Sequence, residues 1–583
     1  MKIFFFLILH FSTIIATYDS FCEKTFIYHR IHGYGYDINC EKLTRQTFSE
    51  LSTTAVFNPI KLRIKSSNLH SIKWHISNNL PSLKEIEIVS SNLFDSNLFF
   101  EKLNDLKILI IENSTINVNS SGILYSGIHK LINLNKLVLD DIFLKFLKFN
   151  ESIFSLEYLN LDNNLIENLN DINFSNFPSL ETLSLKNNKI QCIGNGNYLN
   201  YLKHFYLDYN NIDFINLDLR LLITLTVSFN KLKSLNSLGK MEQLEYLNLE
   251  GNYLESLTDF SQYKNLKYIN LRGNKLRILG DNIFSNNHKL SLLNLNNNQL
   301  ININLNALST TELDLSNNQI KSIDFVIKLR SLKKLDLSFN KISDIPNNIF
   351  KDLDSLTFLN LSFNPLKNNL KENSFYGLIK LLELDLSNTK INELNFSNNL
   401  ISLIKLNVSN NNIANLTGVN DLYSLKILNI SYNHLFNVQE TSISNLKHLI
   451  IIDFEGNHLK NIEYVKILSK LTNLQILNIK NNSLPCEVLD EMIAYFKNNS
   501  VNFTVDNKFN YDKENVAGIY CKQQEFIDRS ENLKLKSFKK YNLFLILMSL
   551  TATFAVLLVI LYAIRLHIRR RRYICDTVQL LDR

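Results

Sequence analysis

The chain has 583 residues and a formal net charge of +7, from 62 Lys and Arg against 55 Asp and Glu. Much of that surplus lies in residues 565–583, so the rest of the chain is nearly neutral. Because phosphate binding needs a concentrated basic face, this balance does not favour a nucleic-acid partner. The length would ordinarily mean several globular domains, unless the sequence repeats internally.

The first segment, residues 1–16, is predicted to be a secretory signal peptide. Lys2 precedes an apolar run from Ile3 to Ile15, and Ala16 supplies a small residue for cleavage. The run is shorter than the roughly 20 residues that span a membrane, and polar sequence follows at once. We therefore expect the chain that follows to be extracellular.

The cysteines flank the middle of the chain in two pairs. Cys22 and Cys40 lie in residues 17–58, and Cys486 and Cys521 lie in residues 485–522. In an oxidising compartment, two flanking pairs predict disulfides that close an N-terminal and a C-terminal cap. Cys192 lies between them, and we expect a buried thiol there, because cysteines outside disulfides are usually buried.

Residues 59–484 repeat the pattern L-x-x-L-x-L-x-x-N-x-L, in about 19 units with a mean period of about 23 residues. In the weaker N-terminal units, Ser67, Ser91 and Ser114 take the place of Asn. Clear units begin at Leu156, Leu180, Leu244, Leu266, Leu290, Leu332, Leu356, Leu425 and Leu474, and weaker ones at Pro59, Leu83, Leu106 and Leu134.

This spacing predicts the fold class: an α/β repeat, namely a leucine-rich-repeat solenoid shaped as a horseshoe with a parallel sheet on its concave face. In L-x-L, both leucines point into the coil because alternate residues of a strand face opposite sides. The Asn column is expected to satisfy loop backbone groups, and a phenylalanine column is expected to fill the outer half of the coils. That column consists of Phe174, Phe260, Phe284, Phe350 and Phe375.

The C-terminal cap is expected to contain a helix from Glu487 to Lys497, with apolar positions at Val488, Leu489, Met492, Tyr495 and Phe496. A stem, residues 523–540, leads to residues 541–564, a stretch without charge. An apolar run of this length predicts one transmembrane helix. Four arginines at 569–572 follow it as a stop-transfer cluster, so the protein is predicted to be a single-pass type I protein of the plasma membrane.

Residues 565–583 form the predicted cytoplasmic tail. Asp576, Leu580 and Leu581 fit an acidic dileucine sorting signal, which clathrin adaptors would bind. The alternative is a disordered chain end without that role.

The repeats, Leu484-Pro485-Cys486 and the segment from Asn515 to Cys521 resemble insect extracellular leucine-rich-repeat transmembrane proteins, which are similar in plan to Toll-type and adhesion-receptor ectodomains. The resemblance implies protein recognition in immunity, adhesion or neural wiring. A cytoplasmic signalling domain like that of Toll receptors is not expected in the 19 residues after the membrane helix, so signalling would need a partner.

On the concave sheet, aromatic and Arg side chains gather between residues 158 and 272, and such residues are typical interface anchors. The alternative is that Tyr simply suits strands. The predicted ligand-binding residues are Tyr158, His204, Tyr206, Tyr246, Tyr268 and Arg272.

Glycosylation is predicted at several N-x-S/T sequons. The predicted acceptors are Asn113, Asn150, Asn173, Asn395, Asn415, Asn498 and Asn502. Three further sequons, at Asn360, Asn407 and Asn429, would place glycans on the concave sheet itself.

No catalytic or metal-binding motif is found, including H-E-x-x-H, G-x-S-x-G, a Walker loop or a zinc-spaced cysteine pair. We therefore expect no enzymatic activity, no catalytic residue, no metal and no cofactor. The leading prediction is a receptor or adhesion protein that binds an extracellular protein or another leucine-rich-repeat chain, or dimerises. The alternative is a membrane-held innate-immune recognition or scaffold protein that binds microbial glycans or forms leucine-rich-repeat complexes.

Overall fold

The computed structural model describes residues 22–29, 33–43, 59–69, 80, 82–93, 103–116, 128–149, 151–194, 199–236, 238–280, 282–367, 369–396, 399–504 and 514–522. The chain divides into two compact units, Met1–Lys522 and Gln523–Arg583. The predicted signal peptide, stem, membrane helix and tail, with Asp576, Leu580 and Leu581, lie outside the described residues. Among the described residues, no helix is both long and apolar enough to cross a membrane.

The first unit begins with a hairpin held by a disulfide. β1 (Cys22–His29) pairs antiparallel with β2 (Gly33–Glu41), and β2 pairs parallel with β3 (Pro59–Lys65). Cys22 and Cys40 stand opposite each other in this register and form the predicted disulfide. The hairpin therefore covers the edge of β3, where the first coil would otherwise leave backbone groups unpaired.

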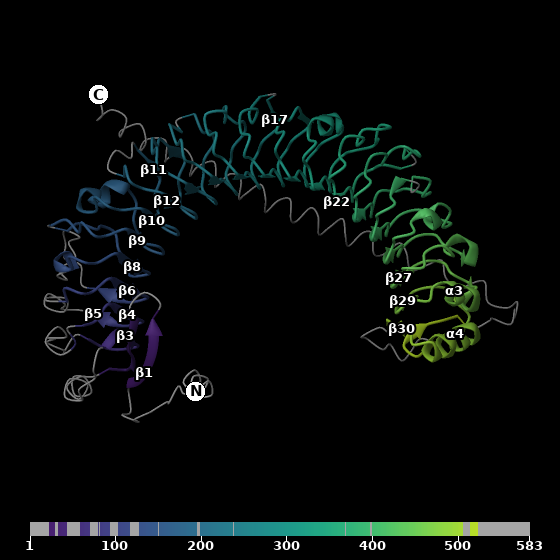
Figure 1. The fold of residues 1–583 in the computed structure, drawn as a ribbon, viewed down its shortest axis with the longest axis horizontal. Helices are drawn as coiled ribbons and strands as arrows, with labels where there is room; N and C mark the ends of the chain where they lie inside the picture. The colour runs from purple at the N-terminus through teal and green to yellow at the C-terminus, as the bar shows by residue number, and fades with distance from the viewer. Residues whose placement is uncertain are drawn as a thin grey trace, which may run out of the picture. The chain divides into compact units, whose positions relative to one another are not determined.

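From β3 onward the strands pair in parallel and in sequence order along the inner side of the coils (Figure 1). The described part of the sheet has 22 strands, of which 19 remain when β1, β2 and the last strand are set aside. After β3 come β4 (Glu85–Val89), β6 (Ile108–Glu112), β8 (Lys136–Asp140), β9 (Tyr158–Asn160), β10 (Thr182–Ser184), β12 (His204–Tyr206), β14 (Thr224–Thr226), β15 (Tyr246–Asn248), β16 (Tyr268–Asn270), β18 (Leu292–Asn294), β20 (Glu312–Asp314), β21 (Lys334–Asp336), β22 (Phe358–Asn360), β23 (Glu383–Asp385), β24 (Lys405–Asn407), β25 (Ile427–Asn429), β27 (Ile451–Asp453), β29 (Ile476–Asn478) and β30 (Asn502–Phe503).

The repeat pattern explains this sheet, as β15 shows. Leu247 at its centre is fully buried, as are Leu244 before it and Leu249 after it. Tyr246 and Asn248, on either side of Leu247, are half-buried on the other face. The leucines of each coil are buried by packing against the adjacent coils, so the core is one continuous column. The leucine-rich-repeat solenoid with stacked parallel strands is confirmed.

The α/β expectation is wrong for the return segments, which in the described residues are mostly short 3-10 turns and two-residue strands. A period of about 23 residues leaves little chain for a helix after the strand and its turn. The turns are η1 (Ile128–Lys130), η2 (Leu169–Asp171), η3 (Phe174–Asn176), η4 (Asp324–Lys328), η6 (Val419–Asp421) and η7 (Glu440–Ser442), with one short helix, α3 (Tyr464–Lys470). The paired short strands are β5 (Asn92–Leu93) with β7 (Thr115–Ile116), β11 (Cys192–Ile193) with β13 (Phe214–Ile215), β17 (Ile278–Leu279) with β19 (Asn302–Ile303), and β26 (Asn437–Val438) with β28 (Asn461–Ile462).

The Asn column joins neighbouring coils through buried hydrogen bonds. Nδ2 of Asn252 donates to the carbonyl oxygens of Val227 at 2.8 Å and Leu249 at 3.1 Å, and its Oδ1 accepts from the Leu232 N–H at 3.0 Å. In the N-terminal coils a serine hydroxyl replaces the Asn side chain as acceptor for the neighbouring coil: the Ser67 N–H donates to Ser91 Oγ at 3.1 Å. The structure therefore confirms both the Asn column and its serine substitutes.

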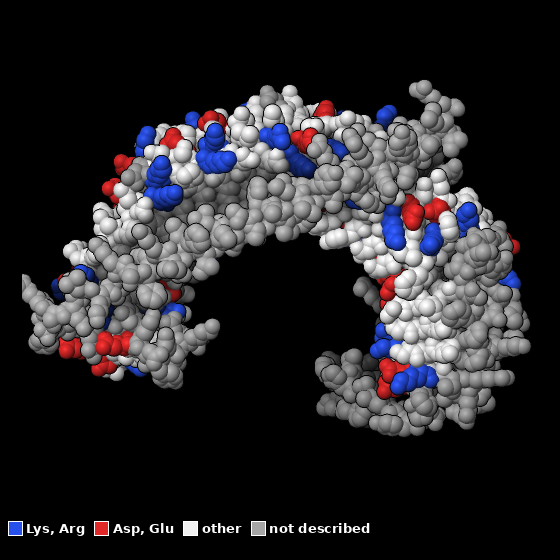
Figure 2. Space-filling model, turned by 180° about the vertical axis from the view of Figure 1, so that it is seen from behind, with Lys and Arg blue, Asp and Glu red and all other residues white. Residues whose placement is uncertain are grey.

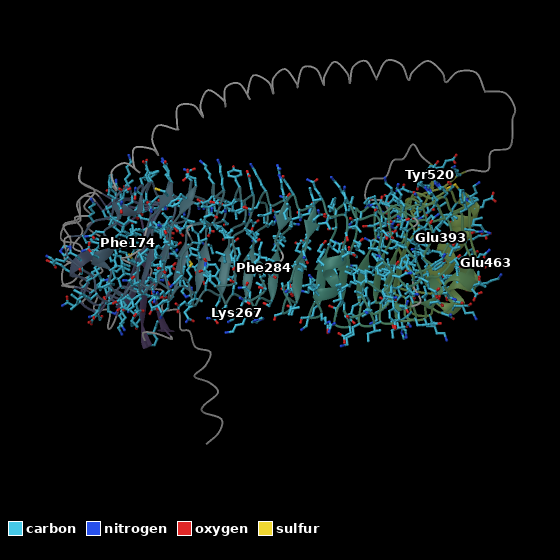
Figure 3. The ribbon with its side chains drawn as sticks, turned by 90° about the horizontal axis from the view of Figure 1, so that it is seen from above. Phe174, Lys267, Phe284, Glu393, Glu463 and Tyr520 are labelled. Carbon is cyan, nitrogen blue, oxygen red and sulfur yellow. A yellow bond between two sulfur atoms is a disulfide. The ribbon has the colours of Figure 1, made fainter. Side chains whose placement is uncertain are left out.

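The phenylalanine column is also confirmed. All five predicted rings are buried, and Phe260 packs on Phe284 with ring centroids 5.5 Å apart. Figure 3, which looks onto the outer side of the coils, shows Phe284 midway between the two edges and Lys267 near one edge. Cys192, by contrast, is half-buried in β11, because the short strand turns its side chain partly outward; the buried thiol predicted there is wrong.

The C-terminal cap is built on α4 (Cys486–Asn498), which the predicted disulfide between Cys486 and Cys521 ties to the short hairpin of β31 (Asn515–Val516) and β32 (Ile519–Tyr520). Leu489, Met492 and Phe496 are buried as predicted, and Ile493 joins them. Val488 and Tyr495 are only half-buried, so the apolar face of the helix is rotated slightly from the predicted one.

Candidate functional site

The concave sheet presents two rows of side chains beside the buried centre of each strand; from β9 to β16 the first row is half-buried, and the second is half-buried or, at Ser184, Thr226 and Asn270, buried. The first row holds the residue before that centre, and the second row holds the residue after it; the parallel register aligns both across strands. From β9 to β16 the first row is Tyr158, Thr182, His204, Thr224, Tyr246 and Tyr268, and the second is Asn160, Ser184, Tyr206, Thr226, Asn248 and Asn270.

Two of the predicted ligand-binding tyrosines stack directly on each other. The rings of Tyr246 and Tyr268, on adjacent strands, are parallel, with centroids 4.2 Å apart. Burial raises the pKa of the Tyr268 hydroxyl strongly, helped by the Tyr246 hydroxyl and the negative charge of Glu250. The Tyr268 hydroxyl therefore stays protonated at physiological pH, and the stacked pair forms a rigid, half-buried amphipathic surface.

The other two tyrosines each carry a lysine over one face. Lys136 Nζ lies 4.9 Å from the ring centroid of Tyr158, and Lys186 Nζ lies 4.8 Å from that of Tyr206. Cation–π contacts of this kind hold the ring and place a positive charge beside it. Burial, followed by the charge of Asp162, raises the pKa of Tyr158, so this ring also stays neutral at physiological pH.

Carboxylates fix the backbone beneath this surface. Asp162 accepts the Ser184 hydroxyl at 2.6 Å and the Lys186 N–H at 2.7 Å. In the buried Asp208, one carboxylate oxygen accepts both the hydroxyl and the N–H of Ser228. Burial raises the pKa of Asp162 against the lowering effect of these hydrogen bonds. These residues lie where the strands end, so they hold the tyrosine-bearing strands in a fixed register.

The two remaining predicted residues have polar partners. His204 Nδ1 lies 3.0 Å from Thr224 Oγ1, and Arg272 pairs with Glu250 at 3.5 Å. Arg272 lies two residues beyond the end of the second row on β16 and is exposed. The structure thus places all six predicted ligand-binding residues on one stretch of sheet from β9 to just after β16. Their binding role stays a prediction.

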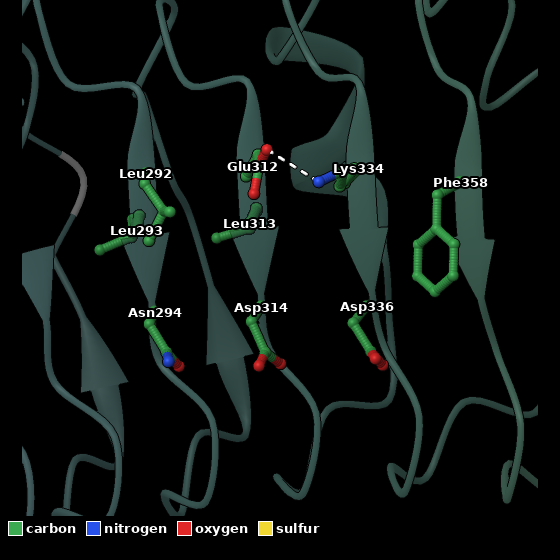
Figure 4. A pocket seen from close by; sticks show the side chains of 9 residues that line it. All are labelled: Leu292, Leu293, Asn294, Glu312, Leu313, Asp314, Lys334, Asp336 and Phe358. Atoms are coloured by element: carbon green, nitrogen blue, oxygen red, sulfur yellow. Dashed lines mark ion pairs between the residues drawn. The ribbon is translucent and has the colours of Figure 1, made fainter. Parts of the chain in front are cut away.

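Next to this stretch the concave sheet is hollowed by a shallow depression across β18 to β22. Figure 4 shows Leu292 and Phe358 at its two sides and Glu312, paired with Lys334 at 3.0 Å, between them. Asp314 and Asp336 lie below, in the second row. This depression was not predicted, although extending the first-row register past Tyr268 places Leu292 and Phe358 on the same face of the sheet.

All but one of the predicted glycosylation sites fall on described residues, and each of these is exposed: Asn113, Asn173, Asn395, Asn415, Asn498 and Asn502. Asn150 lies outside the described residues. On the concave sheet, the amide of Asn360 donates to Asp336 Oδ2 at 3.1 Å and that of Asn407 to Asp385 Oδ2 at 2.9 Å. A glycan on Asn360 or Asn407 would break these side-chain hydrogen bonds to the neighbouring strand. The exposed sequons could carry a glycan without disturbing the sheet.

Charges are mixed over the described surface. On the face in Figure 2, Lys and Arg lie beside Asp and Glu along the coils. Several of these charges form ion pairs between neighbouring coils, such as Lys267 with Glu245 at 2.7 Å and Lys203 with Glu181 at 2.6 Å. Such pairs between exposed groups contribute little to stability, and they leave the concave aromatic rows as the more distinctive surface.

The family model described as "Leucine rich repeat" matches residues 154–212 and 309–366. The chain therefore contains leucine-rich repeats stacked as a solenoid, a repeat fold that typically serves as a non-enzymatic scaffold for protein interaction. No curated protein matches the chain.

Solved structures with similar folds include a leucine-rich-repeat protein of Leptospira interrogans, 20% identical, which covers 79% of this chain and 98% of its own with a TM-score of 0.46. The ectodomain of the plant receptor kinase GASSHO1/SCHENGEN3 from Arabidopsis thaliana, in complex with CASPARIAN STRIP INTEGRITY FACTOR 2, is 20% identical, over 80% of this chain and 63% of its own, with a TM-score of 0.48. TLR13 in complex with ssRNA13 is 24% identical, over 79% and 71%, with a TM-score of 0.42. The ligands in those structures belong to those proteins.

Proposed function

We propose that this chain is a cell-surface receptor or adhesion protein that binds an extracellular protein, or another leucine-rich-repeat chain, through the concave sheet from β9 to β16. The observation that carries the proposal is the row of half-buried, rigidly supported tyrosines on that stretch. Tyrosine offers a large amphipathic contact area with few rotatable bonds to freeze, which suits it to protein interfaces.

The orientation of the rings favours a protein ligand over a glycan. Sugars stack on open aromatic faces, but Tyr246 and Tyr268 cover one face of each other, and a lysine lies over one face each of Tyr158 and Tyr206. Ring edges, hydroxyls and ammonium groups are presented instead. These groups suit carbonyl, carboxylate and apolar side-chain contacts from a protein surface.

The neighbouring depression extends the proposed interface. Leu292 continues the first row directly after Tyr268, so apolar contact runs from the tyrosine pair into the hollow that Phe358 closes on its far side. A protein ligand that lies along the sheet would contact the edges of the tyrosine rings on β9 to β16 and the depression on β18 to β22. Such a ligand would bury a central apolar core with a polar rim, as stable interfaces do.

The membrane part of the proposal rests on the uncharged segment 541–564 and the basic cluster that follows it. The test is protease added outside intact cells that express the chain. The repeats should be digested while a small membrane-bound fragment survives. Full protection of the repeats would contradict a type I orientation.

The binding part is tested by immobilising the secreted repeat unit and screening it against extracellular proteins of the same tissue, with microbial polysaccharides in parallel. Saturable binding of a protein that is lost when Tyr246 and Tyr268 are both changed to Ala supports the proposal. Binding of polysaccharides alone, or of a protein that is insensitive to both changes, would contradict it.

A further inference from the structure

Two exposed histidines face each other on the edge of neighbouring coils, away from the tyrosine rows. His434 and His458 each follow a buried Asn of the Asn column directly, in the coils of β25 and β27. His434 Nδ1 lies 3.4 Å from His458 Nε2, and the ring planes differ by only 4° with centroids 5.5 Å apart. The two ring nitrogens therefore face one another across the gap between the coils.

The coil architecture fixes the backbone of both residues. The His434 N–H donates to the Ile413 carbonyl and the His458 N–H to the Leu435 carbonyl, each at 2.9 Å. Leu435, between the two rings in sequence, is fully buried and bonds through its N–H to Asn457 Oδ1 at 3.0 Å. The distance between the rings is thus set by the spacing of the coils, and only side-chain rotation can change it.

An aromatic ring lies beside one of the two histidines, His458. Phe436 lies 5.6 Å from His458, with its ring inclined by 33°, and is 54% exposed itself. An apolar wall beside imidazole ligands lowers the local access of water, which strengthens polar and metal interactions there. Neither imidazole fills the core, since both side chains are exposed.

We infer that His434 and His458 form a bidentate site for a borderline divalent transition metal ion of the zinc and copper class. Two nitrogens that bind one tetrahedral Zn²⁺, each at 2.0–2.1 Å, lie about 3.3 Å apart. The pair already has that separation in the structure, so binding needs no backbone movement. Neutral imidazole is a preferred ligand of these ions, whereas Mg²⁺ and Ca²⁺ prefer oxygen.

The site supplies two protein ligands and leaves the remaining positions open. Among the described residues, no group of three or more His, Cys, Asp or Glu is arranged around a common metal position. Water completes the coordination, or a donor from a bound partner does. The competing account is a simple N–H···N hydrogen bond between the rings, in which one facing nitrogen keeps its proton.

The test is calorimetric titration of the full chain, purified without a polyhistidine tag, with zinc chloride. His434→Ala and His458→Ala should each weaken binding roughly 100-fold, because the chelate becomes a single-ligand site. His448→Ala is the matched control: it removes an exposed imidazole nearby and leaves the pair intact. Since all three side chains are exposed, the variants should fold, which circular dichroism checks.

A second readout identifies the ligands. With one equivalent of Cu²⁺, electron paramagnetic resonance should show two coordinated nitrogens in the unchanged chain and in His448→Ala, and fewer in the other two variants. The inference is overturned if the unchanged chain shows no saturable zinc binding. It is also overturned if the two pair variants bind as the unchanged chain does, or if His448→Ala loses as much.

Discussion

Gly251 and Gly273 provide a matched pair for testing the packing between coils. Both lie directly before a buried Asn, in neighbouring coils, with φ of 67° and 68°. A Cβ added to Gly273 would have its nearest neighbours at 3.6 Å, whereas one added to Gly251 would lie 2.6 Å from Phe229 Cδ1. Gly273→Ala should therefore cost only the left-handed backbone penalty, about 1–2 kcal/mol.

Gly251→Ala should cost more, because the Phe229 ring must also move. That ring stacks on Tyr209 with centroids 4.6 Å apart and planes within 10°, and breaking such a pair costs about 0.5–1.5 kcal/mol more. The total is about 1.5–3.5 kcal/mol. Equilibrium urea unfolding followed by circular dichroism measures both variants. Equal losses from the two substitutions would refute this account of the coil edge.

A double variant isolates the clash. Phe229→Asn removes the ring and restores a residue that other coils carry at the same place with positive φ, such as Asn297. In that background Gly251→Ala should cost no more than Gly273→Ala does in the unchanged chain. A persistent extra loss would mean that the backbone of the neighbouring coil, and not the ring, resists the added methyl group.

Three further predictions concern the column, the carboxylates and the glycans. Asn252→Ala should destabilise the fold by about 3 kcal/mol in urea unfolding, because it leaves two buried backbone groups unpaired, whereas Gln243→Ala, an exposed change in the same coil, should cost little. Burial, and then the charge of Asp314, raise the pKa of Asp336. The folded state therefore binds this proton more tightly than the unfolded state does. The stability that this group contributes falls as the pH rises through its pKa in the folded state. Asp336→Asn should thus raise the melting temperature relative to the unchanged chain more at about pH 7 than at about pH 4, and a pH-independent difference would contradict the shift. Mass spectrometry of the secreted chain should find glycans at exposed sequons, Asn173 among them, and unmodified peptides throughout would contradict the predicted secretory route.

The columns of the solenoid were predictable because each side chain's role recurs in coil after coil. Leu247 and Asn252 are assigned by a pattern that many other repeats share, so local exceptions hardly disturb the register. The two disulfides were predictable for a related reason. Cysteines that lie just outside both ends of a repeat array have few other partners, and Cys192 is far from either pair.

Features set between coils were not predictable from the pattern. Lys186 over Tyr206, and the stacked rings of Tyr246 and Tyr268, depend on which residues of successive coils align, and on their rotamers. The depression beside Phe358 also depends on which residues align, because Glu312 pairs with Lys334 across adjacent strands between Leu292 and Phe358. The return segments differ from the predicted helices because each period leaves few residues after the strand and its turn. These few residues form 3-10 turns or short strands instead.

The candidate surface was predicted as a row of side chains, and the structure adds how those side chains are held. Sequence register placed Tyr158 and Tyr268 on the same face, but it could not show that Lys136 covers one face of the first ring and Tyr246 one face of the second. For the proposed site, this favours the protein ligand already predicted from the sequence over the alternative, a glycan that would stack on open ring faces.

The central claim is that the tyrosine stretch of the concave sheet binds a protein. It is tested most directly by measuring the affinity of that ligand for the chain with Tyr206, Tyr246 and Tyr268 all changed to Ala, at an unchanged secretion level. We expect a loss of a few kcal/mol, on the scale of interface hot spots. A control with Glu383, Lys405 and Ile427 changed to Ala, in the first row of β23 to β25 and beyond the depression, should lose less. Unchanged affinity after the tyrosine substitutions, or equal losses from both sets, would place the ligand elsewhere and contradict the claim.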